Sequence, residues 1–162
     1  MTRIAVATLS LLLLPSLGAA APPEPAAVAP AAATQAAPAP VPVRVRILKG
    51  SRQGPASLDP KLAPMKQQLS KLAYLRWEQL SERDYQMVLK KTEFTDLPSG
   101  EHVALTVEAT NGRNVTIEVA LAQRNTQSRL TIEKGQRIVH QVSGEKGGVA
   151  YFVSVHAWPT GP

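Results

Sequence analysis

The stretch "HVALTVEATNGRNVTIEVAL", residues 102–121, decides the fold class. Apolar residues recur at every second position on both sides of Asn111-Gly112, and a period of two places them on one face of a strand. The inward set is Val103, Leu105, Val107, Val115, Ile117, Val119 and Leu121. Asn111-Gly112 supplies the positive φ angles that a tight turn needs. The stretch therefore predicts an antiparallel hairpin with one buried face.

Downstream of this hairpin the pattern continues with two more predicted hairpins. Residues 129–142 turn at Lys134-Gly135, and residues 143–158 turn between Glu145 and Gly148. The last strand alternates Val149, Tyr151, Val153 and Val155 with Ala150, Phe152, Ser154 and His156. Because both of its faces are largely apolar, we expect it to be a central strand.

The segments before this hairpin also have strand patterns. Val43, Val45 and Ile47 alternate with Arg44, Arg46 and Leu48. Residues 74–81 and 83–91 read as two strands on either side of a polar break at Ser81-Glu82. The count is about eight strands in one domain, with turn signals every 8 to 12 residues. This pattern predicts a mainly β fold, a single antiparallel β-sandwich or partly closed barrel.

One short amphipathic helix interrupts the strands. Its apolar stripe is Leu62, Met65, Leu69 and Leu72. Asp59 is a good N-cap and Pro60 a good first residue, but Pro64 limits the helix because it removes a backbone donor. A start near Ser57 with a 3₁₀-like first turn and a start at Ala63 are both compatible with the pattern. We expect the stripe to lie on a sheet; a groove for a partner helix is the alternative.

The N-terminal region carries the features of an export signal. Residues 1–20 combine Arg3, an apolar run and small residues before an expected cut after Ala20. A cut one residue later would put Pro22 immediately after it, which fits less well. The apolar run is shorter than the roughly 20 residues of a membrane span, so no transmembrane segment is expected once the signal is removed.

Residues 21–42 hold ten Ala and seven Pro, which predicts a disordered, partly polyproline-II tether. Fully extended, it would reach roughly 60–70 Å. A spacer of this kind lets a domain stand off from whatever holds its N-terminus, and the alternative is a free tail without a function. The predicted domain is 43–158, and 159–162 form a short tail.

Composition narrows the function classes. The chain has no cysteine, which excludes disulfides, a lipid-modified cysteine and thiolate metal sites. It has 18 Lys and Arg against 12 Asp and Glu, a net charge of +6. Export and the scatter of these charges argue against nucleic acid as the partner. Arg44, Arg46, Lys49 and Arg52 form the one loose cluster, and they are the candidate anion-binding residues.

No motif predicts catalysis, a metal or a cofactor. "SGEKGG", residues 143–148, lacks the spacing of a phosphate-binding loop and is not followed by a helix pattern. His102, His140 and His156 lie on separate predicted strands without the spacing of a zinc site. The carboxylates at positions 78, 82 and 84 read as solvated strand ends. We therefore expect a protein that is not an enzyme.

The order of elements resembles a class of known proteins. The tether, "VRILKGSRQG", "LDPKLAPMKQQLSKLAYLRWEQLSE", the "LPSG" turn and the closing "GGVAYFVSVHA" resemble small exported β-rich envelope proteins of myxobacteria and their relatives. The resemblance covers residues 43–158 and brings no catalytic residues with it. Some of those proteins belong to gliding-motility machinery, where a tether would bridge a gap across the envelope.

Two functions follow as expectations. The first is a non-enzymatic component of a bacterial envelope assembly, in the periplasm or at the outer membrane, such as the gliding apparatus, with envelope proteins as partners. The alternative is a stand-alone binding module for an anionic glycan or lipid headgroup. In the alternative, Arg44, Arg46, Lys49 and Arg52 would supply the charge, and binding would fall steeply with salt.

Overall fold

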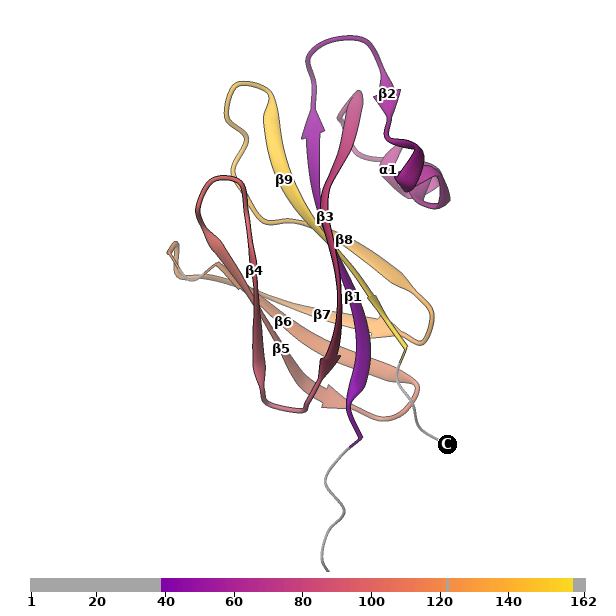
Figure 1. The fold of residues 1–162 in the computed structure, drawn as a ribbon, viewed down its shortest axis with the longest axis vertical. Coiled ribbons are helices and arrows are strands. Elements are labelled where there is room, and N and C mark those ends of the chain that lie inside the picture. The colour runs from indigo at the N-terminus through magenta and orange to yellow at the C-terminus, as the bar shows by residue number, and fades with distance from the viewer. Residues whose placement is uncertain (1–38, 122, 159–162) are drawn as a thin grey trace, which may run out of the picture. The chain divides into compact units, whose positions relative to one another are not determined.

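The computed structural model describes residues 39–121 and 123–158, so the predicted signal peptide, most of the tether and the tail lie outside the described residues. In these described residues, nine strands form two sheets (Figure 1). The elements are β1 (Val41–Ser51), β2 (Ser57–Leu58), a 3₁₀ helix (Pro60–Met65), α1 (Lys66–Leu69), β3 (Arg76–Met87), β4 (Thr92–Asp96), β5 (His102–Thr110), β6 (Asn114–Leu121), β7 (Thr126–Glu133), β8 (Arg137–Gln141) and β9 (Val149–Ala157). The five-stranded sheet has the order β2-β3-β1-β9-β8, and the four-stranded sheet has the order β4-β5-β6-β7.

The main core lies between the two sheets, which confirms the predicted mainly β, sandwich-like fold. Val45 of β1 and Val155 of β9 contribute from the five-stranded sheet, and Leu105 of β5 and Ile117 of β6 contribute from the other. These side chains are almost completely removed from solvent. Burial of apolar surface, at about 25 cal/mol per Å², is therefore the main force that holds the two sheets together.

The hairpin of β5 and β6 has the predicted form. All seven residues of its inward set are buried. Gly112 has φ 77°, and the side chain of Asn111 accepts hydrogen bonds from the backbone N–H groups of Arg113 and Asn114. Of the two predicted turn residues only Gly112 has a positive φ, and Asn111 instead stabilises the turn through its side chain.

A second apolar cluster lies on the outer face of the five-stranded sheet. Leu62, Met65 and Leu69 pack against Phe152 of β9 and Trp77 of β3, so the apolar stripe lies on the sheet as predicted. Gly50 of β1 permits this packing, because a Cβ there would lie 3.0 Å from ring atoms of both Phe152 and Tyr74.

The helical segment itself is mostly 3₁₀. It begins at Pro60 after Asp59, whose carboxylate accepts from the Lys61 N–H at 2.9 Å. Pro64 lies inside it, and only one turn of α-helix follows. The missing N–H of Pro64 accounts for this tight, short form. No helix among the described residues has the length and apolar character that crossing a membrane requires.

The predicted break at Ser81-Glu82 is wrong, because β3 runs without interruption through both residues. β1 and β3 pair along their whole length, with one register shift between Ile47 and Leu48. The polar residues of β3 are accommodated because they face basic residues of β1, as described below. β1 also begins at Val41, two residues before the predicted start of the domain, and Val41 is buried.

The predicted hairpin at Lys134-Gly135 is also wrong. β7 pairs with β6 and β8 pairs with β9, so this turn carries the chain from one sheet to the other. The turn is attached to both sheets, since the Lys134 N–H donates to the Arg113 carbonyl and the Gly135 N–H donates to the Ala157 carbonyl. β7 and β8 are therefore edge strands of different sheets. β9 lies between β1 and β8, which confirms its predicted central place.

Candidate binding surfaces

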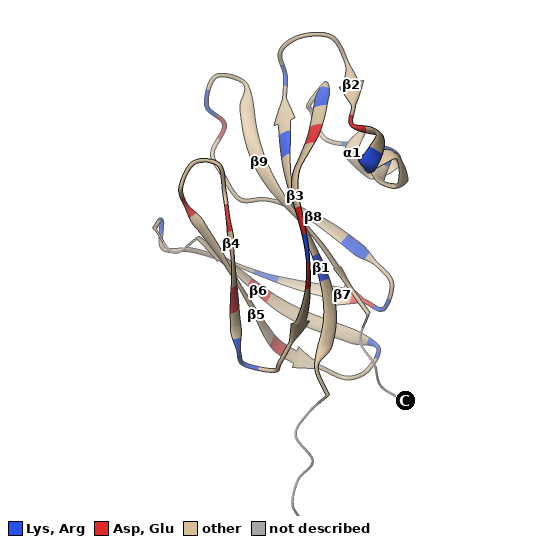
Figure 2. Ribbon diagram, viewed as in Figure 1, with Lys and Arg blue, Asp and Glu red and all other residues tan. Residues whose placement is uncertain are grey.

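The four predicted anion-binding residues lie along β1 and just after it, and each has a carboxylate partner. The pairs, with N···O distances, are Arg44–Asp84 (2.7 Å), Arg46–Glu82 (2.7 Å), Lys49–Glu78 (3.6 Å) and Arg52–Glu145 (3.0 Å). Figure 2 shows the basic segments of β1 beside acidic segments of β3. Most of the positive charge of these four residues is therefore balanced within the domain.

The acidic residues of β3 are partners in these pairs and do not sit at strand ends. The hydrogen bond from Arg46 holds the pKa of Glu82 below its ordinary value, and the hydrogen bond from Arg44 does the same for the pKa of Asp84. Glu82 also lies 3.3 Å from the Arg44 guanidinium. Sequence spacing hides this arrangement, because Arg46 and Glu82 are 36 residues apart.

The β1–β3 pairs belong to a polar row that crosses four strands. The strand register aligns Asp84 of β3, Arg44 of β1, His156 of β9 and Arg137 of β8. Arg137 has no carboxylate within ion-pair distance among the described residues. Burial, and after it the positive charges of Arg46 and Arg44, lower the pKa of Arg137 below its ordinary value. Within the described part of the chain, Arg137 is therefore the one cation of this row that is not in an ion pair.

His156 connects Arg137 to an aromatic neighbour. Its Nε2 lies 3.0 Å from the Gly135 carbonyl, so Nε2 carries the proton and donates it there. Nδ1 is then free to accept from the Arg137 Nη2 at 3.4 Å. The Trp158 ring packs on the imidazole with centroids 3.9 Å apart, and the Arg44 guanidinium lies 5.7 Å from the Trp158 ring centroid. The row thus contains one ring of an aromatic pair.

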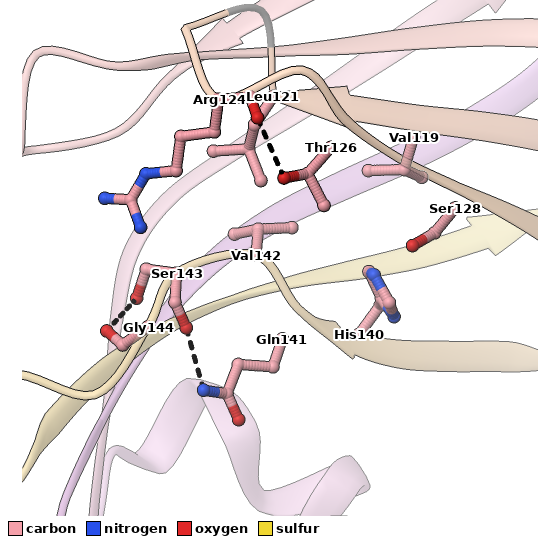
Figure 3. A pocket seen from close by; sticks show the side chains of 10 residues that line it. All are labelled: Val119, Leu121, Arg124, Thr126, Ser128, His140, Gln141, Val142, Ser143 and Gly144. Carbon is pink, nitrogen blue, oxygen red and sulfur yellow. Dashed lines mark hydrogen bonds between the residues drawn. The ribbon is translucent and has the colours of Figure 1, made fainter.

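A cavity of about 240 Å³ lies elsewhere, on the side of the sandwich where β7 and β8 are edge strands (Figure 3). It is lined by Val119, Leu121, Arg124, Thr126, Ser128, His140, Gln141, Val142, Ser143 and Gly144. These residues come from the end of β6, from β7, from β8 and from the loops beside them. The Thr126 hydroxyl donates to the Arg124 carbonyl at 3.3 Å, and the Gln141 amide donates to the Ser143 carbonyl at 2.7 Å. The cavity therefore has a mixed polar and apolar wall.

The three histidines stay apart. His102 lies on β5 and its Nδ1 is 2.7 Å from an Asp96 oxygen, His140 lines the cavity, and His156 belongs to the polar row. Within residues 39–121 and 123–158, no group of three or more His, Asp or Glu side chains is arranged to hold a metal ion.

The stability of the domain is expected to fall as the pH decreases below about 6.5. Burial lowers the pKa of His140, and burial together with Arg137 lowers the pKa of His156. Below the ordinary pKa the unfolded chain binds protons that the folded domain does not, so acid favours unfolding. Urea unfolding between pH 8 and pH 5 measures the effect. His140→Gln should flatten the curve, and an unchanged curve in that variant would contradict a role for this residue.

At lower pH, protonation of the carboxylates is expected to reduce the stability of the folded domain further. The pKa values of Glu82 and Asp84 are lowered in the folded domain, so their contribution is complete above the ordinary carboxylate pKa. It is lost as the pH falls through the lowered values, because the unfolded chain again binds protons first. Because histidines and carboxylates bind protons in different pH ranges, the pH dependence of stability separates the contribution of the histidines from that of the ion pairs.

Comparison with known proteins finds no match, since no family model, no curated protein and no solved structure is significantly similar to this chain. The function is therefore inferred from the residues and the geometry described above.

Proposed function

We propose that this protein is a non-enzymatic component of a bacterial envelope assembly. We further propose that it binds a partner protein at the side of the sandwich where β7 and β8 are edge strands, called the open side below. The observation that carries the proposal is the cavity of about 240 Å³ bordered by two edge strands, β7 and β8. An edge strand presents unpaired backbone donors and acceptors, to which an extended segment of another protein can add. A neighbouring cavity then gives specificity by accepting one of its side chains.

The cavity wall supports binding over a reaction. Val119 and Val142 provide an apolar surface, and Ser128 and Gln141 provide hydrogen-bonding groups near it. A hydroxyl nucleophile needs a base within hydrogen-bond reach. Among the described residues, His140 has no hydrogen bond to a serine or threonine hydroxyl. A partly apolar cavity with a few polar groups is typical of a recognition site.

The expected export signal and tether give the proposal its location. An Ala/Pro-rich segment before the domain would let it reach across a gap, as a component of a trans-envelope machine must. The resemblance to envelope proteins of myxobacteria suggests the gliding apparatus as one such machine. Periplasmic or outer-membrane association is part of the same proposal.

The test uses the absence of cysteine in the chain. Ser128→Cys places a unique thiol on the cavity wall, and Lys61→Cys places one on the exposed side of the 3₁₀ helix as a control. Each tagged, full-length variant is labelled with a photoactivatable thiol reagent and irradiated in envelope fractions of the native host. A defined set of envelope proteins should cross-link to position 128 and not to position 61.

The captured protein is then purified and its affinity measured. Ser128→Trp, which fills the mouth of the cavity, should weaken binding at least about ten-fold, whereas Lys61→Trp should leave it unchanged. Equal effects of the two tryptophans would remove the open side from the proposal. Recovery of the protein alone, with either thiol, would contradict the role in an assembly.

A further inference from the structure

We propose that the outer face of the five-stranded sheet carries a second binding site, in which Arg137 binds the carboxylate of an acidic sugar. The site is separate from the cavity of the proposed partner surface, because its side chains lie on the opposite face of the sheet from the core between the two sheets; the two share strand β8, which begins at Arg137. It differs from the cluster that the sequence suggested, since its central residue is on β8 and not on β1.

The charges of the polar row indicate where an anion would bind. The row and its neighbour hold the guanidinium groups of Arg44, Arg46 and Arg137 and the carboxylates of Glu82 and Asp84. The two carboxylates pair with Arg44 and Arg46, which, among the described residues, leaves one positive charge at Arg137. A single negative charge on a ligand would complete the balance.

The guanidinium of Arg137 is held in position before any ligand arrives. It is partly buried, and its Nη2 donates to His156 Nδ1 at 3.4 Å. The backbone carbonyl of Arg137 accepts from the Gln68 amide of α1 at 3.0 Å, which fixes the start of β8. A positioned side chain loses less conformational entropy when it binds, so the arrangement favours recognition.

The hydrogen-bonding capacity of Arg137 fits a carboxylate. A guanidinium has five N–H donors in a planar fork, which matches the two oxygens of a carboxylate. Within the described residues, the contact with His156 is the only side-chain hydrogen bond of Arg137. The remaining donors are therefore available to a ligand. Bidentate pairs of this kind are among the stronger hydrogen bonds in proteins.

The surroundings of Arg137 favour a sugar over a lipid headgroup. His156, which contacts the Arg137 guanidinium, packs on Trp158, and aromatic rings provide the apolar surface that ligand sites combine with a few polar groups. The carboxylate of Glu82, whose negative charge acts on Arg137, can accept hydrogen bonds from sugar hydroxyl groups. A bilayer of anionic lipids presents many charges at once, whereas the described part of the row offers one cation outside an ion pair.

The experiment titrates the full chain with sodium glucuronate and follows backbone amide shifts by NMR. Glucuronate should shift amides around Arg137 and His156 saturably, and glucose, which lacks the carboxylate, should not. Arg137→Gln should weaken binding at least about ten-fold, and Arg137→Lys, which keeps the charge but loses the fork, should fall between the two. Arg129→Gln, on the exposed side of β7, is the matched control and should bind as the wild type does.

Several results would overturn the inference. Equal shifts with glucose, or unchanged affinity in Arg137→Gln, would show that this guanidinium does not recognise a carboxylate. Stronger binding of inorganic phosphate or of phosphatidylglycerol vesicles than of glucuronate would replace the sugar by a phosphate ligand. Thermal unfolding of each variant separates lost binding from lost folding, and Arg137→Lys still tests the site if Arg137→Gln unfolds. Cross-linking from position 128 stays unaffected by these results, so the two proposals fail separately.

Discussion

Replacing Phe152 with alanine is expected to lower the free energy of unfolding by about 3–5 kcal/mol. The Phe152 side chain is 2% exposed and lies between the five-stranded sheet and the helical segment. Its ring centroid is 5.2 Å from that of Tyr74 and 5.0 Å from that of Trp77. Truncation therefore removes buried apolar area and two aromatic contacts, and it leaves a cavity that rigid neighbours cannot fill.

The chain contains its own control for this measurement. Phe94, the only other phenylalanine, is 55% exposed on edge strand β4. Phe94→Ala should change the free energy of unfolding by no more than about 0.5 kcal/mol. Urea unfolding of both variants gives the comparison. Similar losses in the two variants would mean that the second apolar cluster does not hold the helical segment on the sheet.

Replacing Leu105 with alanine is expected to cost about 2–5 kcal/mol through the core between the sheets. Leu105 is completely buried on β5, in the cluster that includes Val45 and Val155 of the opposite sheet. A small domain has a total stability of about 5–15 kcal/mol, so this change removes a large fraction of it. Thermal and urea unfolding of the variant measure the loss.

Leu75→Ala is the matched control for the core variant. Leu75 is 53% exposed just before β3, so its truncation should cost no more than about 0.5 kcal/mol. If Leu75→Ala destabilised the domain as much as Leu105→Ala, the inter-sheet core would not be the main source of stability. Together, the two phenylalanines and the two leucines test both apolar clusters with residues of the same chemistry.

The sequence predicted the local elements well where one signal dominated. The hairpin of β5 and β6 follows from strict alternation around Asn111-Gly112. Its turn position and its buried face are as predicted, although only Gly112 of the two turn residues has a positive φ. The apolar stripe from Leu62 to Leu69 also lies where its spacing placed it. In these segments the periodicity alone states which side chains are buried, because the rule depends only on neighbours in the chain.

The sequence-based prediction was wrong about which strands pair with each other. Lys134-Gly135 has the form of a hairpin turn, but β7 pairs with β6 and β8 pairs with β9. The local sequence pattern shows that a segment alternates between buried and exposed residues, but it does not show which other strand lies beside that segment. The open side of the sandwich, and with it the cavity in the proposed function, exists because of this separation.

The candidate sites show the same division between local and tertiary information. The chain by itself determined a mainly β domain, a helix with one apolar face and a cluster of cations on β1. Only the tertiary structure decided which of these charges are free, because ion pairs form between strands that are distant in sequence. Glu82 and Asp84 pair with the cations of β1. Arg137, which no local pattern distinguishes, lies beside His156 and has no carboxylate within ion-pair distance in the described part of the chain. The sequence states which side chains are charged. Whether two charges neutralise each other depends on the distance between them, and the packing of the strands sets that distance.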